Sequence, residues 1–226
     1  SADTDSALSI STTRVGIGAA APTNNLHIEA DSGDEGITIH AAGDTSNAVI
    51  LDANRAGAGS GLGAFVGKWN GTAVADILFL TGSDTTNKDD GEITFRTSSA
   101  DNLTEQMRID SSGSVGIGTT APEGKFHVDA GDAGSVTASV NADEMIVETD
   151  TDGGISVLSP DANWGALSFG SPGADVNALI ASNYNSGNQI LRFYVGGEAS
   201  GDMKMIINSA GNVGIGTAAP DTICHI

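Results

Sequence analysis

Val115-Gly-Ile-Gly-Thr-Thr-Ala-Pro122, followed by Phe126-His127-Val128, is one of three closely similar blocks, and the other two begin at Val15 and Val213. On a strand, this alternation places Val and Ile on one face and only glycine hydrogen atoms on the other. A bare face lets another backbone approach closely, and the proline cannot donate to a sheet. The block therefore predicts a short strand, a break and a second short strand.

The similarity extends upstream of the second and third blocks. Met107-Arg-Ile-Asp-Ser-Ser-Gly-Ser114 matches Met205-Ile-Ile-Asn-Ser-Ala-Gly-Asn212. Asp-Ser-Ser-Gly and Asn-Ser-Ala-Gly are turn sequences whose glycine is free to adopt a positive φ. We therefore predict a strand, a tight turn and the Val-Gly-Ile-Gly strand, which together form a hairpin-like corner.

The segments between the blocks also have strand character. Residues 36–40, 92–96 and 190–195 are rich in β-branched and aromatic residues, and no long stretch has a helical apolar period. Residues 36–40 resemble 154–158, and residues 47–51 resemble 165–169. We expect an extra strand near 135–148 and an added hairpin near 81–92, where Asp89-Asp90-Gly91 predicts a tight turn.

The composition indicates that one chain cannot bury a full core. Aromatic residues make up only 4% of the 226 residues, whereas glycine alone numbers 31. Little side-chain bulk favours burial that is completed by further copies of the chain. Cys224 is the single cysteine, so no intrachain disulfide is possible, and we interpret it as a small buried apolar residue.

The charge balance excludes some partners. The chain has 29 acidic and 9 basic residues and a formal net charge of −20. Such a surface repels phosphate backbones, which argues against nucleic-acid binding. No apolar run approaches the ~18 residues of a membrane-spanning helix, so we expect no membrane insertion. High negative charge keeps an extended assembly soluble.

The repeat from Met107 to Pro122, followed by Phe126-His127-Val128, resembles a repeat of phage tail fibre and tail-spike-like proteins. Glu144-Met-Ile-Val-Glu148 and the residues from Gly154 to Asn163 resemble the module between such repeats. The resemblance implies an elongated homotrimer in the virion tail, extracellular after release, often upstream of an endosialidase-type intramolecular chaperone. It also implies contacts with other tail proteins and with a host surface glycan or protein.

Several residues are candidates for sites, each with a structural alternative. His27, His127 and His225 share one repeat position and could form metal-binding rings in a trimer. We favour hydrogen-bonding histidines, because no second ligand such as His-x-His is present. Glu148, Asp150 and Asp152 imitate the start of a calcium loop, but Ser159 stands where its bidentate glutamate belongs, so we favour an acidic turn.

Aromatic residues beside turn sequences are candidates for receptor contact. Trp69 and Asn70 precede Gly-Thr, and Tyr184 and Asn185 precede Ser-Gly. Stacking on sugars competes with packing in a core, which is the more common state of such residues. We expect no cofactor and no metal.

The predicted fold is all-β: an elongated, intertwined homotrimer with β modules joined by narrow triple-stranded stem segments. The predicted segments are stem repeats at 1–27, 107–127 and 205–226, the last truncated, and β modules at 28–106 and 128–204. Stem positions expected to face the trimer axis or a neighbouring chain are Val15, Ile17, Val115, Ile117, Val213 and Ile215, with Gly116 and Gly118 leaving room for that chain.

The predicted function is structural and receptor-binding, in host-cell attachment, rather than enzymatic. The first alternative is a polysaccharide-degrading tail spike of the glycoside hydrolase type, which needs two suitably spaced carboxylates. No nucleophile elbow, phosphate loop or zinc-helix motif is present in the sequence. The second alternative is a bacterial surface adhesin or an extracellular filament subunit.

Overall fold

A computed structural model describes residues 8–19, 21–29, 37, 39–40, 46–134, 137–185 and 188–226, with the backbone alone for residues 184, 185, 188 and 200. The chain divides into two compact units, Ser1–Asp52 and Ala53–Ile226. All sheets are built from short or medium strands, and the described residues include no α-helix. The all-β fold class predicted from the sequence is confirmed. No helix in the described part is long and apolar enough to cross a membrane.

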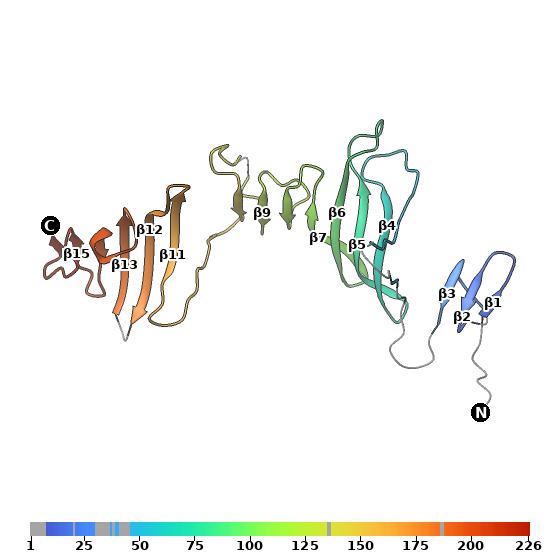
Figure 1. Ribbon diagram of the computed structural model, residues 1–226, viewed down its shortest axis with the longest axis horizontal. Helices are drawn as coiled ribbons and strands as arrows, with labels where there is room; N and C mark the ends of the chain where they lie inside the picture. Colours follow the sequence, from blue (N-terminus) through green and yellow to red (C-terminus); the bar gives the residue numbers. More distant parts are fainter. Residues whose placement is uncertain are drawn as a thin grey trace, which may run out of the picture. The chain divides into compact units, whose positions relative to one another are not determined.

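The first unit holds a three-stranded sheet made by the first sequence block (Figure 1). Its strands are β1 (Leu8–Ile10), β2 (Val15–Ile17) and β3 (Leu26–Ile28). β1 pairs antiparallel with β2, and β2 pairs parallel with β3.

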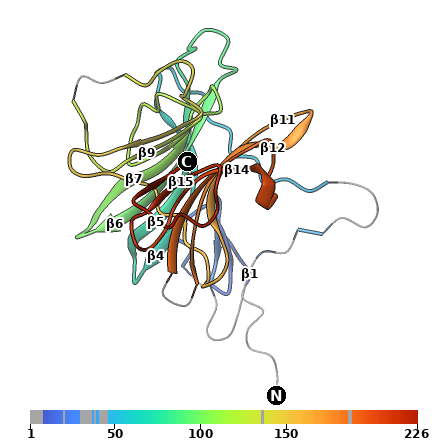
Figure 2. The ribbon, with the colours of Figure 1, turned by 90° about the vertical axis from the view of Figure 1, so that its left-hand side faces the viewer.

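The second unit holds two larger sheets. The seven-stranded sheet has the order β10-β9-β8-β7-β6-β5-β4, and its central strands can be followed in Figures 1 and 2. Its strands are β4 (Gly61–Trp69), β5 (Thr72–Thr81), β6 (Gly91–Ser99), β7 (Asn102–Ile109), β8 (Val115–Ile117), β9 (Phe126–Asp129) and β10 (Met145–Glu148).

The six-stranded sheet has the order β11-β12-β13-β14-β15-β16. Its strands are β11 (Gly165–Ser171), β12 (Ala174–Asn185), β13 (Asn188–Val195), β14 (Met203–Ile207), β15 (Val213–Ile215) and β16 (Cys224–His225), with a 3-10 turn, η1 (Ser200–Asp202), before β14.

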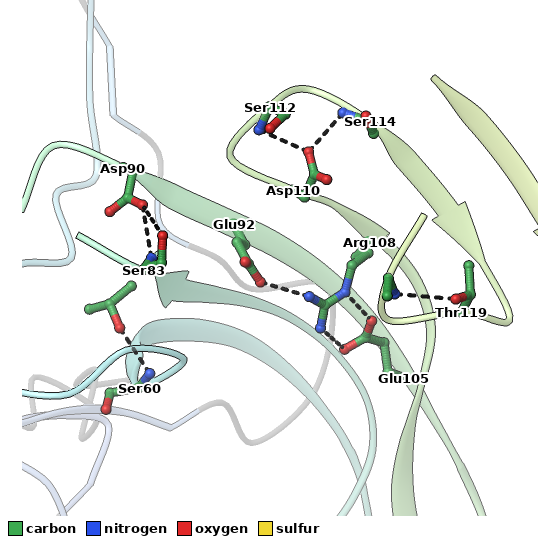
Figure 3. A network of polar contacts seen from close by, with 12 residues as sticks. Ser60, Ser83, Asp90, Glu92, Glu105, Arg108, Asp110, Ser112, Ser114 and Thr119 are labelled. Carbon is green, nitrogen blue, oxygen red and sulfur yellow. Dashed lines mark hydrogen bonds and ion pairs between the residues drawn. The ribbon is translucent and has the colours of Figure 1, made fainter. Parts of the chain in front are cut away.

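The corner predicted before the second and third Val-Gly-Ile-Gly strands is confirmed. Gly113 and Gly211 have φ of 76° and 81°. The side chain of Asp110 accepts hydrogen bonds from the backbone N–H groups of Ser112 and Ser114, at 2.9 and 2.8 Å, as Figure 3 shows. Asn208 makes the same contacts with the N–H groups of residues 210 and 212. The two sequences therefore close one turn by one mechanism.

Each block then makes an unusually short parallel connection. β8 pairs parallel with β9, with Gly116 opposite His127, and the first and third blocks pair in the same way. Parallel strands are usually joined by about a dozen residues or more. Here residues 118–125 suffice, because Gly118 turns the chain at a φ of 80° and the following residues fold back over the strand.

Other predicted elements have mixed outcomes. Residues 92–96 and 190–195 lie in β6 and β13, and the extra strand is β10. Ile37, Ile39 and His40 are not in a strand, whereas residues 36 and 38 lie outside the described part. The tight turn predicted at Asp89-Asp90-Gly91 is wrong: the connection spans residues 82–90, because the Asp90 carboxylate binds the backbone of Ser83 and Asp84 across it.

Burial within the described part of a single chain is sparse. Its buried apolar residues are Ala19, Leu179, Ala181, Tyr194 and Ile206. Cys224, expected to be buried, is exposed, because β16 is the last strand of its sheet. The predicted segment boundaries remain predictions, although the seven-stranded sheet includes strands from three of the predicted segments.

Candidate functional site

The repeated histidines lie against the turn after each proline. The Nδ1 atom of His127 accepts a hydrogen bond from the N–H of Glu123 at 3.3 Å, and His27 accepts one from Thr23 at the same distance. In the third block, Nδ1 of His225 lies 3.0 Å from Oδ1 of Asp221. The ring accepts a backbone hydrogen bond in the first two blocks and lies against a carboxylate in the third, which favours the hydrogen-bonding interpretation for His27 and His127.

His127 also has a second partner. Its side chain is only 2% exposed, and its Nε2 atom lies 3.0 Å from Oε2 of Glu148 on β10. The other oxygen of Glu148 accepts the N–H of Ala133 at 2.8 Å. The pair thus fastens β10 and the loop before it to the second block.

The calcium-loop candidates are not brought together. Glu148 is committed to His127, and Asp150 lies against Gly131 instead. Among the residues that the structure describes, no three or more of His, Cys, Asp and Glu are grouped closely enough to hold a metal ion. A ring of three histidines contributed by three chains stays a prediction.

The glycines of the block are close to their own chain. A β-carbon on Gly116 would lie 2.8 Å from the carbonyl oxygen of Thr119, and one on Gly214 would lie 2.7 Å from that of Thr217. A β-carbon on Gly118 would collide with the carbonyl group of Asp129. The bare face predicted from the sequence therefore receives the folded-back turn of the same chain. Approach by a neighbouring chain is not needed to explain these glycines.

One face of the seven-stranded sheet carries apolar residues across its whole width. Register pairing connects each residue to the next strand, and alternate residues on each strand share the face. The two rows are Gly63-Phe79-Ile93-Ile109-Val115-Phe126-Met145 and Phe65-Ile77-Phe95-Met107-Ile117-Val128-Val147. We call them the apolar face of this sheet.

This apolar face is poorly covered by its own chain. Phe65, Ile77, Phe126, Met145 and Val147 are all exposed, with Phe65 at 51%. Phe65 and Phe79 meet edge to face, with ring centroids 6.0 Å apart, so the rows are packed laterally. The described residues supply no full layer above them, which a sheet with one apolar face normally requires.

The six-stranded sheet repeats the arrangement. Its apolar face includes the rows Leu167-Ile180-Phe193-Met205-Ile215 and Gly165-Ser182-Leu191-Ile207-Val213-Cys224. Leu167, Phe169, Ile180, Val195 and Ile215 are exposed. The predicted stem positions Val115, Ile117, Val213 and Ile215 all lie in these rows, and Val15 and Ile17 occupy the matching positions of β2. Their contact with another chain stays a prediction.

The opposite face of the seven-stranded sheet is a network of ion pairs, part of which Figure 3 shows. The Arg108 guanidinium donates to Glu105 at 2.6 and 2.9 Å and to Glu92 at 2.9 Å. The hydrogen-bonded Glu105 carboxylate raises the pKa of Arg108. Arg96 pairs with the buried Asp76, which raises the pKa of Arg96 in the same way. This face is satisfied within one chain.

The opposite face of the six-stranded sheet carries a buried apolar cluster, although Ala166 and Ser168 of β11 are exposed on it. Leu179, Ala181 and Tyr194 form a buried cluster with Val176 and Met203 packed against it. Trp164 stacks on Tyr194 at 5.4 Å between ring centroids, and the Arg192 guanidinium lies 5.8 Å from the Trp164 ring. Tyr194 is therefore packed in the core, whereas Trp164 covers its ring and stays 40% exposed.

Trp69 and Asn70 lie at the tip of the β4–β5 hairpin. Asn70 and Gly71 form its two-residue turn, with φ of 48° and 88°, and Trp69 pairs with Thr72. The Trp69 side chain is 79% exposed. A rigid turn thus presents a free aromatic face. The side chains of Tyr184 and Asn185 lie outside the described part of the structure.

Sequence reasoning missed the two-sided contacts of His127 and the ion pairs of Arg108. Glu148 lies in a segment whose strand was expected, but nothing in the sequence pairs that strand with β9. Alternation of charged with apolar residues on β6 and β7 was the available signal for the ion-paired face.

Comparison with known proteins finds similarity among solved structures. No protein-family model and no curated protein matches the chain. Among solved structures, the chain is similar to the carboxy-terminal domain of the bacteriophage T5 L-shaped tail fibre, with a TM-score of 0.36 and 10% sequence identity. The similarity covers 83% of this chain and 91% of the T5 chain.

Proposed function

We propose that this chain is a structural and receptor-binding segment of a phage tail fibre, which assembles as an elongated, intertwined homotrimer and mediates attachment to the host cell. The repeat resemblance from Met107 to Val128 supports the tail-fibre assignment. In this proposal the chain resides in the virion tail, is extracellular after release, and has other tail proteins as neighbours. Its role is mechanical and adhesive rather than enzymatic.

The uncovered apolar faces of the two larger sheets are the observation that carries the proposal. On these faces Phe65, Met145, Leu167 and Phe169 are each at least half exposed, whereas large apolar side chains are usually buried. Surface of this kind and extent is typical of chains whose core is completed by other subunits. Further copies of the same chain would supply the layer above each sheet, because both larger sheets have an uncovered apolar face.

Attachment would then depend on repetition. Three chains present three copies of each loop, so weak contacts add through avidity. Trp69 and Asn70 are the contact residues that we propose, since a rigid hairpin holds the exposed Trp69 ring ready to stack on a sugar. A host surface glycan is the ligand class that this chemistry fits best.

Solution mass tests the assembly. Light scattering on the purified chain should give a mass near three times 22.6 kDa, together with a species that resists an unheated denaturing gel. A mass equal to one chain would overturn the homotrimer and with it the fibre assignment.

Binding to an array of purified bacterial lipopolysaccharides tests the contact residues. Trp69→Ala should abolish a signal that the unmodified chain gives, because avidity multiplies the loss at each of three sites. Trp164→Phe is the matched control, since Trp164 is engaged by Tyr194 and should leave binding unchanged. Equal binding by Trp69→Ala and the unmodified chain would overturn the role of this hairpin.

A further inference from the structure

Residues 154–158, Gly-Ile-Ser-Val-Leu, have the sequence of a strand but are not in one. Ile155, Val157 and Leu158 are exposed, Leu158 at 91%. No backbone group of these five residues is hydrogen-bonded to any residue that the structure describes. A β-rich apolar segment with free donors and acceptors is a template for pairing with another strand.

The segment is held above the sheet rather than beside it. A turn from Pro160 to Asn163, closed by an N–H to O=C bond of 3.0 Å, connects it to β11. A β-carbon on Gly165 would lie 2.9 Å from the carbonyl oxygen of Val157, so Val157 lies over the face at the first residue of β11. Among the described residues, no strand of its own chain therefore lies beside the outer edge of β11.

An apolar groove separates the segment from the sheet. Its volume is about 400 Å³, and Ile155, Val157 and Leu158 line it on one side, with Leu167, Ile180 and Leu191 on the other. The groove opens onto the apolar face of the six-stranded sheet, which is the surface assigned above to contact between copies.

The open edge of β11 matches the segment in side-chain pattern. Leu167 and Phe169 alternate on the apolar face of β11, and both are at least half exposed. Ile155 and Val157 have the same alternation. A strand added at this edge with Ile155 and Val157 on that face would extend the apolar rows by one strand.

We propose that residues 154–158 of one chain pair, as an added strand, with the outer edge of β11 in a second copy of the same chain. The inference rests on the proposed homo-oligomer and names its partner segments. Strand exchange gives hydrogen-bond partners to the unpaired backbone N–H and C=O groups of both elements. It also places the side chains of Ile155 and Val157 beside those of Leu167 and Phe169, so that each covers part of its neighbour. It also accounts for a strand-like sequence that has no partner within the described part of its own chain.

A second apolar segment, before the seven-stranded sheet, is also unpaired. Residues 47–51, which precede the seven-stranded sheet, are also strand-like and lie outside any strand, with Val49 and Ile50 exposed. Each large sheet is thus preceded by an unpaired apolar segment and has a long, exposed edge strand, β4 or β11. Exchange between copies would resolve both cases in one way.

Disulfide trapping between two different chains tests the exchange. One chain carries Ile155→Cys and the other carries Leu167→Cys, both in a Cys224→Ser background that removes the single native thiol. The chains bear different tags, are unfolded, mixed and refolded, and are then oxidised. Residues facing each other on paired strands have β-carbons about 4.5–5.5 Å apart, within or close to disulfide range.

We expect a cross-linked heterodimer that carries both tags in most of the molecules. Ser168→Cys in place of Leu167→Cys is the matched control, since Ser168 lies on the opposite face of β11 and should give little product. Phe169→Cys serves as a second partner, so that a shift in register is still detected.

Three results separate the two proposals. A trimeric mass with no heterodimer from either partner overturns the exchange and leaves the proposed function intact. A cross-link that forms only when Ile155→Cys and Leu167→Cys are in the same chain also overturns it, because residues 154–158 then pair with their own β11. A monomeric mass overturns the proposed function, and the exchange falls with it.

Discussion

The seven-stranded and six-stranded sheets are alike in the residues of one face and differ in those of the other. Both are built from the same corner and the same Val-Gly-Ile strand, and both carry uncovered apolar rows. On the opposite face, however, position 108 is an arginine bound to two glutamates, whereas the matching position 206 is a buried isoleucine. The opposite face makes its contacts within one chain, so its residues can be charged in one sheet and apolar in the other. The uncovered face is apolar in both sheets.

A charge placed on the uncovered face should have the largest effect. Leu167→Asp in the six-stranded sheet and Phe65→Asp in the seven-stranded sheet should each abolish assembly, because burying an unpaired carboxylate between copies costs several kcal/mol per chain. The mass from light scattering should fall to that of one chain.

Ser168→Asp is the control for this experiment, since Ser168 is the exposed neighbour of Leu167 on the opposite face. It should leave the mass unchanged, as surface substitutions generally alter stability by about 0.5 kcal/mol or less. Assembly that survives both Leu167→Asp and Phe65→Asp would show that the uncovered face is not an interface.

Giving each sheet the residue type of the other, at positions 108 and 206, tests the difference between their opposite faces. Ile206→Arg should lower the free energy of unfolding by about 3 kcal/mol or more, because the new charge is buried and faces Arg192 across the strand pair. Arg108→Ile should cost less, about 1–3 kcal/mol, since Glu92 and Glu105 remain partly exposed. Chemical denaturation measures both values, and similar losses would contradict the difference drawn between these faces.

The glycine of the block should behave alike in the two sheets. Gly116→Val and Gly214→Val each place a β-carbon against a carbonyl oxygen of the folded-back turn, so we expect losses of about 1–3 kcal/mol in both. Gly67→Val is the matched control, because the nearest atom to a β-carbon there is 3.5 Å away. Thermal unfolding that left Gly116→Val equal to Gly67→Val would remove the explanation given for the bare strand.

Much of this comparison could be predicted from the sequence, because it depends on local patterns. The Asp-Ser-Ser-Gly turn, the Val-Gly-Ile strand and the strands at 92–96 and 190–195 all follow from residue type and alternation. The parallel return of each block does not, since its short connection is possible only through the contacts of Gly118 and His127. Interactions between residues far apart in the sequence, such as His127 with Glu148, leave no local pattern.

The same limit applies to the candidate site. Histidine at one repeat position indicated a shared task, but the sequence could not separate a metal ligand from a turn-closing acceptor. The structure supplies the distinguishing atoms: Nδ1 accepts a backbone N–H in the first two blocks, and in the second block Glu148 occupies the other nitrogen. A neighbouring chain was likewise inferred for the bare glycine face, where the folded turn of the same chain already lies.

Alanine substitutions of two of the repeated histidines test how similar the turns after the proline are in the second and third blocks. His127→Ala removes the acceptor for the Glu123 N–H and the partner of Glu148 from a buried position, so we expect a loss of about 1–3 kcal/mol per group left unpaired. His225→Ala should cost less than about 1 kcal/mol, because its side chain is partly exposed, it closes no backbone hydrogen bond, and its Asp221 partner is largely exposed. Urea unfolding of the two variants compares them directly. Equal losses would mean that the buried contacts of His127 with Glu123 and Glu148 add nothing to stability, and that β10 is held to the seven-stranded sheet by its backbone alone.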